Sequence, residues 1–523
     1  ELISNISLEV LNMKKQSLIK GSIILGLAGI IAKFLGFFFR WPLIMLIGDT
    51  GIGYYQLSYP LYMFFVAMAS GVPIAISKMI SEKNAVGDIE GSYEVVKESV
   101  YLMAILGIGT SLLLFFFAKP IISFLKWNPK SYYSLIAISF APMMISFVNV
   151  FRGFFQGMQN MTHTGVSQIL EQMGRVIVGV GMAIILLPKG IEYSAGGASL
   201  GAAGGGVLAL AYLYIKYSEV KKENGIKKIK SNPEILNKIL QIAIPISIGT
   251  TVGTIMSLID SILVPQKLLL SGISEANATI LYGQLTGKAS VLVNIPLTIS
   301  MAIGTSLIPI IAESFILNKK KSMESKINMS MKLSAVIAFP SALGLFFLAE
   351  PIMKLIFFKN YQGIEILRYL SLSIPFIIIT QTSTSVLQAS NHYIRPVINL
   401  FAGCLVKVLL TWYLVTIPKI NIYGAVIASI GAYITVAVLN MISLKGKLKI
   451  SIDYYNCFFK PLAAALAMSA GVVMTYVKVM KSIENESISC LLAIFVGIII
   501  YMIAIMLLKV FRLEEIKDRL VKK

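Results

Sequence analysis

Long apolar segments follow one another along the chain, and short polar stretches separate them. A helix of about 20 apolar residues is long enough to cross the hydrocarbon core of a bilayer. The pattern therefore predicts an all-α polytopic membrane protein with about 14 transmembrane helices. The predicted spans are residues 20–47, 54–81, 93–118, 131–155, 163–188, 194–217, 234–265, 276–313, 324–349, 362–388, 393–417, 421–444, 457–478 and 487–510.

The longest polar connection between spans divides the chain into comparable blocks. It carries seven lysines between Lys216 and Lys238 and follows the sixth span. Six further spans come after it, and two remain at the end, so we expect two six-helix lobes and a C-terminal pair of helices. The expected division is a cytoplasmic N-terminal segment (1–19), an N-lobe (20–217), a basic cytoplasmic linker (218–233), a C-lobe (234–444), and the last two helices with a basic cytoplasmic C-terminus (445–523).

Two pairs of segments indicate that the lobes arose by duplication. The run FFQGMQNMTHTGVSQILEQMGRV from Phe154 aligns without gaps with VLQASNHYIRPVINLFAGCLVKV from Val386. The run GVPIAISKMISEKN from Gly71 resembles SLIPIIAESFILNK from Ser306, in the same order and at a similar offset. An even number of spans per copy gives both copies the same orientation. Such parallel repeats are typical of transporters with a site between the lobes.

Lysine and arginine outnumber aspartate and glutamate by 46 to 25, which gives a formal net charge of +21. With the N-terminus placed inside, the inner segments hold 30 of these cations, the outer loops 11 and the spans five. Cytoplasmic loops of membrane proteins carry an excess of lysine and arginine, so both termini are expected to be cytoplasmic. Orientation and contact with anionic membrane lipids then explain the charge, and nucleic-acid binding is not needed.

The first predicted span carries a stripe of small and cationic residues on an otherwise apolar helix. A spacing of three or four residues places the members of the stripe on one helical face. A cation in the middle of the bilayer costs roughly 2.5–3.5 kcal/mol even on the mildest insertion scale. The stripe is therefore expected to face an anion-binding cavity, and pairing with acids of a neighbouring helix is the alternative. Its members are Ser22, Gly26, Gly29, Lys33, Gly36 and Arg40.

Three further cations lie within predicted spans. The duplication pairs Arg175 with Lys407, and the two lobes are expected to present them across a shared cavity. Glu171 precedes Arg175 by four residues, the favoured order for a helical ion pair, so a structural role is the alternative. Lys407 has no acid within its own span, which favours a functional role. Lys288 is either a cavity residue or a residue that snorkels to the membrane surface.

Only two acids, Glu171 and Asp260, lie well inside the predicted spans. Five intramembrane cations against these two leave at least three positive charges for which a polyanionic ligand is the expected partner. Arginine suits bidentate contact with phosphate, and lysine suits a point-charge contact. Asp260 is a candidate for receiving a coupling Na⁺ or H⁺, and a salt bridge with a neighbouring cation explains it equally well.

Metal and cofactor chemistry is not expected. The glycine-rich run AGGASLGAAGGG (195–206) opens an apolar span, which is typical of close helix packing and not of nucleotide binding. The three cysteines lack metal-ligand spacing and are expected to be small buried residues, and the two histidines are isolated. No cleavable signal peptide is expected, because the segment after Lys20 is too long for one, and Met13 is a candidate start.

Four motifs resemble the polysaccharide-export and lipid-flippase branch of the multidrug/oligosaccharidyl-lipid/polysaccharide superfamily, in particular its sporulation-protein members. The likeness runs nearly end to end from about Met13 and extends, more distantly, to the MurJ-type lipid II flippases. The motifs are KFLGFFFR (33–40), YPLYMFFVAMASGVPIAISKMISE (59–82), FRGFFQGMQNMTHTGVSQILEQMGRV (151–176) and YGQLTGKASVLVNIPLTISMAIGTSLIPIIAES (282–314).

The resemblance implies two MATE-like six-helix lobes around a V-shaped cavity, and two terminal helices that help to form a groove for a polyprenyl tail. It implies that an undecaprenyl-diphosphate-linked cell-wall precursor is turned from the inner to the outer leaflet of the bacterial cytoplasmic membrane. Lys33 matches a position that is usually arginine in the family. Asp260 resembles an acid linked to sodium in some MurJ-type members, whereas Lys288 departs from the small or apolar residue expected at its position.

The expected function is therefore a flippase working by alternating access for peptidoglycan or spore-cortex synthesis, and not an enzyme. Cell-wall synthesis proteins are candidate partners. The alternatives are a polysaccharide repeat-unit exporter, a cation-coupled drug exporter of the same fold and a non-transporting sporulation scaffold. An exporter of cationic drugs would carry acids in its cavity, whereas the charge excess here is positive. The expected substrate contacts are Lys33, Arg40, Arg175, Lys407 and Lys288 for the diphosphate, and Gln156, Gln168 and Gln172 for the sugar or peptide.

Overall fold

The computed structural model of the protein describes residues 18–226, 229–317 and 319–511. Every regular element within these ranges is a helix, which confirms the all-α fold class predicted from the apolar pattern. The chain forms two compact units, each with its own interior.

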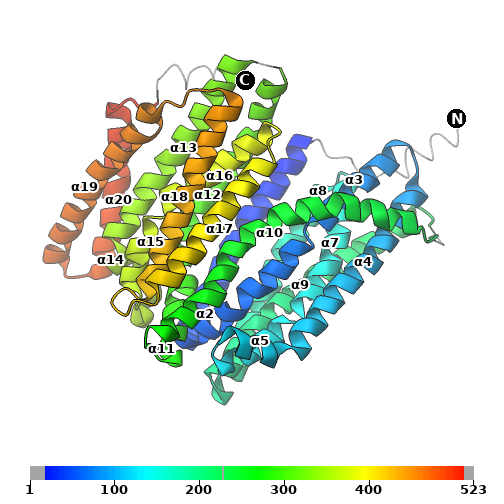
Figure 1. The fold of residues 1–523 in the computed structure, drawn as a ribbon, viewed down its shortest axis with the longest axis horizontal. Helices are drawn as coiled ribbons and strands as arrows, with labels where there is room; N and C mark the ends of the chain where they lie inside the picture. The colour runs from blue at the N-terminus through cyan, green and yellow to red at the C-terminus, as the bar shows by residue number, and fades with distance from the viewer. Residues whose placement is uncertain (1–17, 227–228, 318, 512–523) are drawn as a thin grey trace. The chain divides into compact units, whose positions relative to one another are not determined.

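The first unit comprises residues 1–266 and 274–283 and contains the helices from α2 to α11 (Figure 1). The last residues of α10 belong to the second unit. The helices of the first unit are α2 (Leu18–Met68), α3 (Gly71–Ala85), α4 (Ile89–Phe116), α5 (Ala118–Leu125), α6 (Tyr132–Ile138), α7 (Ala141–Gly157), α8 (Met161–Leu186), α9 (Ile191–Glu223), α10 (Pro233–Leu270) and α11 (Glu275–Gly283), with the 3₁₀ turns η1 (Pro129–Ser131) and η2 (Leu187–Lys189).

The second unit comprises residues 267–273 and 284–523. Two of its short elements, η3 and η5, are π-helical turns. Its elements are η3 (Gln284–Ala289), α12 (Ser290–Ile316), α13 (Lys320–Phe347), α14 (Ala349–Phe357), η4 (Phe358–Asn360), α15 (Ile364–Ser371), α16 (Ile374–Ala389), α17 (Ile394–Leu414), α18 (Ile422–Leu448), η5 (Tyr455–Phe459), α19 (Lys460–Ile483) and α20 (Glu486–Leu507).

Eleven segments of the described chain are long and apolar enough to cross a membrane, or twelve if the bent pair of α15 and α16 counts as one span. This confirms a multi-pass membrane protein, whereas the predicted number of fourteen spans is not confirmed. One of the eleven segments, Ile24–Ala85, holds two of the predicted spans in 62 residues. It is interrupted at Gly48, whose φ of 61° and ψ of −168° are readily adopted only by glycine.

The order of elements in the first unit recurs in the second. A 28-residue helix (α4, α13) is followed by a helix of eight or nine residues (α5, α14) and a three-residue 3₁₀ turn (η1, η4). A helix of seven or eight residues (α6, α15) and one of 17 or 16 (α7, α16) come next, and two long helices complete each series (α8 and α9, α17 and α18). The recurrence supports the duplication inferred from the aligned segments.

The glycine-rich run 195–206 is helical and lies in α9, against α8. A Cβ atom on Gly205 would lie 2.2 Å from the carbonyl oxygen of Glu171, and one on Gly201 would lie 2.7 Å from the carbonyl oxygen of Arg175. Only glycine allows two helix backbones to approach this closely. The prediction that this run serves close helix packing is confirmed.

Replacing Gly205 with alanine is expected to lower the free energy of unfolding by about 1–3 kcal/mol, because the added methyl group forces α8 and α9 apart. The matched control is Gly181→Ala in α8, where a Cβ would meet nothing within 4 Å. The control is expected to leave the unfolding energy unchanged or slightly raised. Denaturant unfolding in mixed micelles measures both variants, and equal energies for the two would contradict this packing argument.

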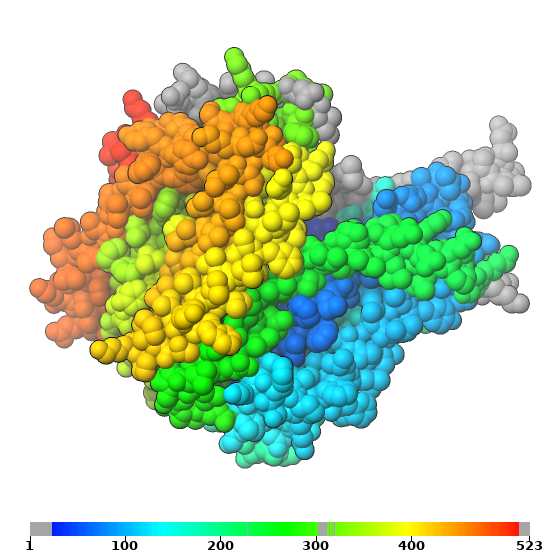
Figure 2. Space-filling view, in the orientation of Figure 1, coloured from blue at the N-terminus to red at the C-terminus, as the bar shows by residue number. Residues whose placement is uncertain are grey.

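The outward surface of the helices is apolar where a bilayer would cover it. In the second unit α17, yellow in Figure 2, runs along the surface. Each of four apolar or aromatic side chains on it is more than half exposed: Leu405, Leu409, Trp412 and Tyr413. Such a continuous apolar face is stable against lipid and not against water.

Both units contain closely packed apolar clusters in their interiors. In the first unit α3, α4, α7, α9 and α10 share one core, in which the rings of Tyr93 and Tyr217 lie 5.8 Å apart. The three cysteines, Cys404, Cys457 and Cys490, are buried and free, which confirms their expected place as small buried residues.

Asp88 begins α4 as its N-cap, with its carboxylate accepting from the backbone N–H of Gly91 at 2.8 Å and from the ammonium of Lys83. These two bonds, the lysine first, hold the pKa of Asp88 below its usual range. A depressed pKa adds stability at neutral pH that is lost as the pH falls below about 4, the ordinary value for aspartate.

We therefore expect acid to destabilise the wild type more steeply than an Asp88→Asn variant, in which asparagine still caps the helix but does not titrate. Unfolding measured from pH 7 down to pH 3 tests this. Parallel pH profiles for the two proteins would contradict it.

Candidate functional site

Helix α2 turns at Gly48, and this brings aromatic residues after the turn beside the first predicted span. The ring of Tyr55 lies 6.0 Å from that of Phe39, and the guanidinium of Arg40 lies 5.7 Å from the centre of the Tyr59 ring. Tyr55 and Tyr59 are stacked at 5.5 Å, so that Arg40 faces a row of tyrosines.

Helix α8 runs along the first part of α2 with small residues at the contact. A Cβ atom on Gly36 would lie 3.7 Å from the side-chain oxygen of Gln172, and one on Gly179 would lie 2.6 Å from the ring of Phe39. The stripe predicted on the first span therefore meets α8 at Gly36. This places Arg40 and the polar face of α8 in the same region of the first unit.

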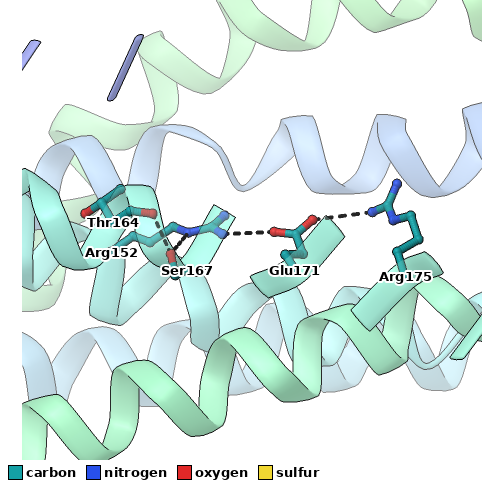
Figure 3. A network of polar contacts seen from close by, with 5 residues as sticks. All are labelled: Arg152, Thr164, Ser167, Glu171 and Arg175. Carbon is teal, nitrogen blue, oxygen red and sulfur yellow. Dashed lines mark hydrogen bonds and ion pairs between the residues drawn. The ribbon is translucent and has the colours of Figure 1, made fainter. Parts of the chain in front are cut away.

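Arg175 lies on this face of α8 and is 8% exposed. Its guanidinium donates to the hydroxyl of Tyr59 at 3.2 Å and to the carboxylate of Glu171 at 3.4 Å. The ion pair predicted from the spacing of Glu171 and Arg175 is thus present (Figure 3). Because Arg40 also contacts Tyr59, one tyrosine connects two of the predicted cations.

A second arginine, Arg152 of α7, shares the same carboxylate. Its guanidinium donates to Glu171 at 3.0 Å and to the hydroxyl of Ser167 at 2.9 Å, and Ser167 in turn donates to the carbonyl of Thr164 (Figure 3). We call Arg40, Arg152, Arg175, Glu171 and Tyr59 the arginine cluster. It holds three cations and one anion.

Three polar side-chain atoms on this face of α8 are buried without a hydrogen-bond partner in the described part of the chain: Nε of Arg175, Oε1 of Gln168 and Oγ1 of Thr164. Arg40 contacts the Tyr59 ring, and no described carboxylate lies within ion-pair distance of it. An unsatisfied buried donor costs about 1–3 kcal/mol. A ligand that supplied acceptor oxygens to Arg175 and Arg40 would recover this energy.

Three other predicted residues of the first unit lie outside these contacts. Lys33 is exposed on α2, seven residues before Arg40. Gln156 is half-buried near the end of α7. Asp260 is half-buried in α10, next to Ser261, whose carbonyl accepts from the indole of Trp127 at 2.7 Å. Their roles in binding or coupling stay predictions.

Lys407 and Lys288 belong to the second unit. Lys407 lies in α17 and is 3% exposed. Lys288 is fully buried in the π-helical turn η3, where its ammonium donates to the backbone carbonyls of Asn360 and Gln362. Both roles expected for Lys288, in a cavity or at the membrane surface, stay predictions. The expected pairing of Arg175 and Lys407 across a cavity stays a prediction.

Arg152 and the tyrosines were not among the predicted site residues. Arg152 was counted with the loop cations, because it lies near the end of a predicted span. The tyrosines did carry a signal, since Tyr55, Tyr59 and Tyr62 are spaced by four and three residues and so share one helical face. What the sequence did not show is that the turn at Gly48 brings this face to Arg40.

The second unit contains an apolar groove of about 370 Å³. Residues of α12, α13, α14, α19 and α20 line it, among them Pro296, Gly344, Met468 and Gly497. Proline and glycine at these positions leave the helix surfaces without bulky side chains, which keeps the groove open. The shape and lining suit a hydrocarbon chain.

The fold defines the class of protein, a multi-pass membrane protein of the kind found in MurJ and MATE transporters. A solved structure titled "Lipid II flippase MurJ, inward closed conformation" superposes with a TM-score of 0.71 at 16% identity, over 93% of this chain and 99% of that one. The profile described as "Polysaccharide biosynthesis protein" matches residues 18–315, and the MatE profile matches residues 286–413. The chain belongs to the polysaccharide biosynthesis protein family.

Two relatives from Bacillus subtilis (strain 168) show where in this family the chain lies. It is 28% identical to stage V sporulation protein B over 97% of this chain and 98% of that protein. It is 26% identical to lipid II flippase MurJ over 87% of this chain and 86% of that protein. The resemblance to the sporulation branch is confirmed, and the second of these relatives is named as a flippase.

Proposed function

We propose that this protein flips a polyprenyl-diphosphate-linked saccharide, lipid II or a related undecaprenyl glycolipid, across the bacterial cytoplasmic membrane. The observation that carries the proposal is the arginine cluster, with three cations against one carboxylate and a buried unsatisfied Nε on Arg175. Membership of the polysaccharide biosynthesis family and similarity to a lipid II flippase support the same class of cargo.

A diphosphate suits this cluster because guanidinium groups bind phosphate oxygens through paired, charge-assisted hydrogen bonds. Arg40 and Arg175 would hold the diphosphate between them, at the level of Tyr59. Glu171 would keep Arg152 and Arg175 oriented when no cargo is bound. Gln168 and Gln172, on the same helix, would contact the sugar or peptide.

The tail of such a cargo requires an apolar surface. The groove formed by α12, α13, α14, α19 and α20 is the candidate site for part of the polyprenyl chain. Its lining is mostly isoleucine, leucine, valine, methionine and proline, so binding there would remove the hydrocarbon surface of the tail from water. Alternating access, with Asp260 as the candidate site for a coupling Na⁺ or H⁺, completes the proposal.

The relatives indicate the cellular process that the proposed cargo would serve. Similarity to a sporulation protein favours cargo for peptidoglycan or the spore cortex. Both termini would be cytoplasmic, as the distribution of lysine and arginine predicts, and cell-wall synthesis proteins would be the partners. The match of the MatE profile raises a drug exporter of the same fold as the alternative. The positive charge of the arginine cluster disfavours cationic drugs, because like charges would have to be buried together.

Transport in proteoliposomes tests the proposal. The purified protein is reconstituted with a fluorescent undecaprenyl-diphosphate glycolipid, and the rate at which the label reaches the opposite leaflet is measured. We expect flipping well above that of protein-free vesicles, and slower flipping in an Arg40→Gln variant. A fluorescent cationic drug in the same vesicles is expected not to move. Flipping no faster than in empty vesicles would overturn the proposal.

A further inference from the structure

The first unit contains another apolar groove, which shares no lining residue with the arginine cluster. It has a volume of about 720 Å³ and lies between α4, α7 and α9, with Val100, Phe147 and Tyr214 among its lining residues. Ile229, in the linker between α9 and α10, also lines it. Helices α4 and α9, and the segment Pro129–Gly157 that ends with α7, are long and apolar enough to span a membrane, so the groove suits hydrocarbon better than water.

One charged residue lines this groove: Lys97 of α4. Its ammonium donates to the carbonyl of Ile229 at 3.0 Å, and it makes no other hydrogen bond with the described residues. An ammonium has three donors, so two remain for a ligand. The adjacent Glu98 does not neutralise Lys97, because it is buried and accepts from the hydroxyl of Ser231 at 2.6 Å and the N–H of Asn232 at 3.0 Å.

The position of Lys97 along α4 matches the level of lipid phosphates. Nineteen residues of α4 follow it, which at 1.5 Å per residue span roughly 28 Å. This is close to the thickness of the hydrocarbon core, about 30 Å. With the end of α4 at one face of the hydrocarbon core, Lys97 would lie at the opposite face, where the head groups begin.

We infer that this groove binds a phospholipid with an anionic head group, with one acyl chain between α4, α7 and α9 and the phosphate against Lys97. A single cation complements a single phosphate, whereas the diphosphate of the proposed cargo is better matched by the three arginines of the cluster. Basic pockets between membrane helices on the cytoplasmic side are a recurring form of anionic lipid site. The bound lipid would contact both Ile229 of the linker and Lys97 of α4. This inference does not rest on the proposed function.

Native mass spectrometry of the delipidated full-length protein tests the inference, with phosphatidylglycerol and phosphatidylcholine of identical chains as probes. We expect one phosphatidylglycerol to be retained in preference to phosphatidylcholine. Lys97→Gln is expected to weaken phosphatidylglycerol retention about fivefold, as for the loss of one lysine beside an anionic lipid. Lys97→Arg is expected to preserve it. Equal retention of the two lipids by the wild type would overturn the inference.

Two further variants locate the site. Ala211 is exposed in the groove, so Ala211→Phe fills it without disturbing a packed interior, and we expect it to lower retention although every charge remains. Lys222 is exposed in the last turn of α9 and does not line the groove, so Lys222→Gln is the matched charge control and is expected to bind as the wild type does. If Lys222→Gln weakened binding as much as Lys97→Gln, the site would not be this groove.

Discussion

Replacing Arg175 with glutamine is expected to slow flipping of an undecaprenyl-diphosphate glycolipid about 10- to 100-fold. A hydrogen bond to a charged group contributes roughly 1.5–3 kcal/mol, and each 1.36 kcal/mol in a barrier is tenfold in rate. Glutamine keeps a polar side chain of moderate size but removes the charge and the planar fork that suits phosphate oxygens. The measurement is the initial rate of leaflet exchange in proteoliposomes.

Two controls accompany the Arg175 variant. Arg175→Lys retains the charge without the fork, so its rate is expected to fall between those of the wild type and the glutamine variant. Arg395→Gln removes an exposed arginine at the start of α17 and is expected to flip as fast as the wild type. If Arg175→Gln also flipped at the wild-type rate, the arginine cluster would not hold the cargo.

Replacing Glu171 with glutamine is expected to lower the free energy of unfolding by about 3–5 kcal/mol, the usual cost of removing one partner from a buried ion pair. The side chain of Glu171 is 12% exposed, and those of its partners Arg152 and Arg175 are 13% and 10% exposed. Without the carboxylate two nearly buried guanidinium groups face each other uncompensated. Denaturant unfolding in mixed micelles gives the energy.

The control for this effect is Glu219→Gln, which removes the acid of an exposed ion pair with Lys216. Exposed pairs contribute roughly 0–1 kcal/mol, so this variant is expected to unfold nearly as the wild type does. Adding Arg152→Met to Glu171→Gln removes one of the uncompensated charges and is expected to recover part of the loss. Arg152→Met is also measured alone. If its effect on the free energy of unfolding were the same in the wild type and in Glu171→Gln, Arg152 and Glu171 would not be coupled.

Much of the fold could be predicted because its determinants are local. Runs of about 20 apolar residues predict helices wherever they occur, and the four-residue spacing of Glu171 and Arg175 is sufficient to predict their ion pair. Close packing at the glycine run 195–206 followed from side-chain size alone. The number of spans was less predictable, because the break at Gly48 within α2 and the bend between α15 and α16 do not interrupt the apolar pattern.

The candidate site was only partly predictable because its partners come from different helices. Arg152 and Glu171 are 19 residues apart on α7 and α8, and nothing in their spacing brings them together. Tyr59 meets Arg40 and Arg175 only after α2 has turned at Gly48. The burial of Lys288 depends in the same way on the chain near Asn360, more than 70 residues further on.

The most direct test of the account is native mass spectrometry of the purified protein with added lipid II. The wild type is expected to retain one molecule of lipid II, and an Arg40→Gln/Arg175→Gln double variant is expected to lose it while still folding, as judged by its unfolding transition. A Lys33→Gln variant measured beside them shows whether the exposed lysine of the first span contributes. Equal retention of lipid II by the wild type and the double variant would contradict the claim that the arginine cluster binds the diphosphate.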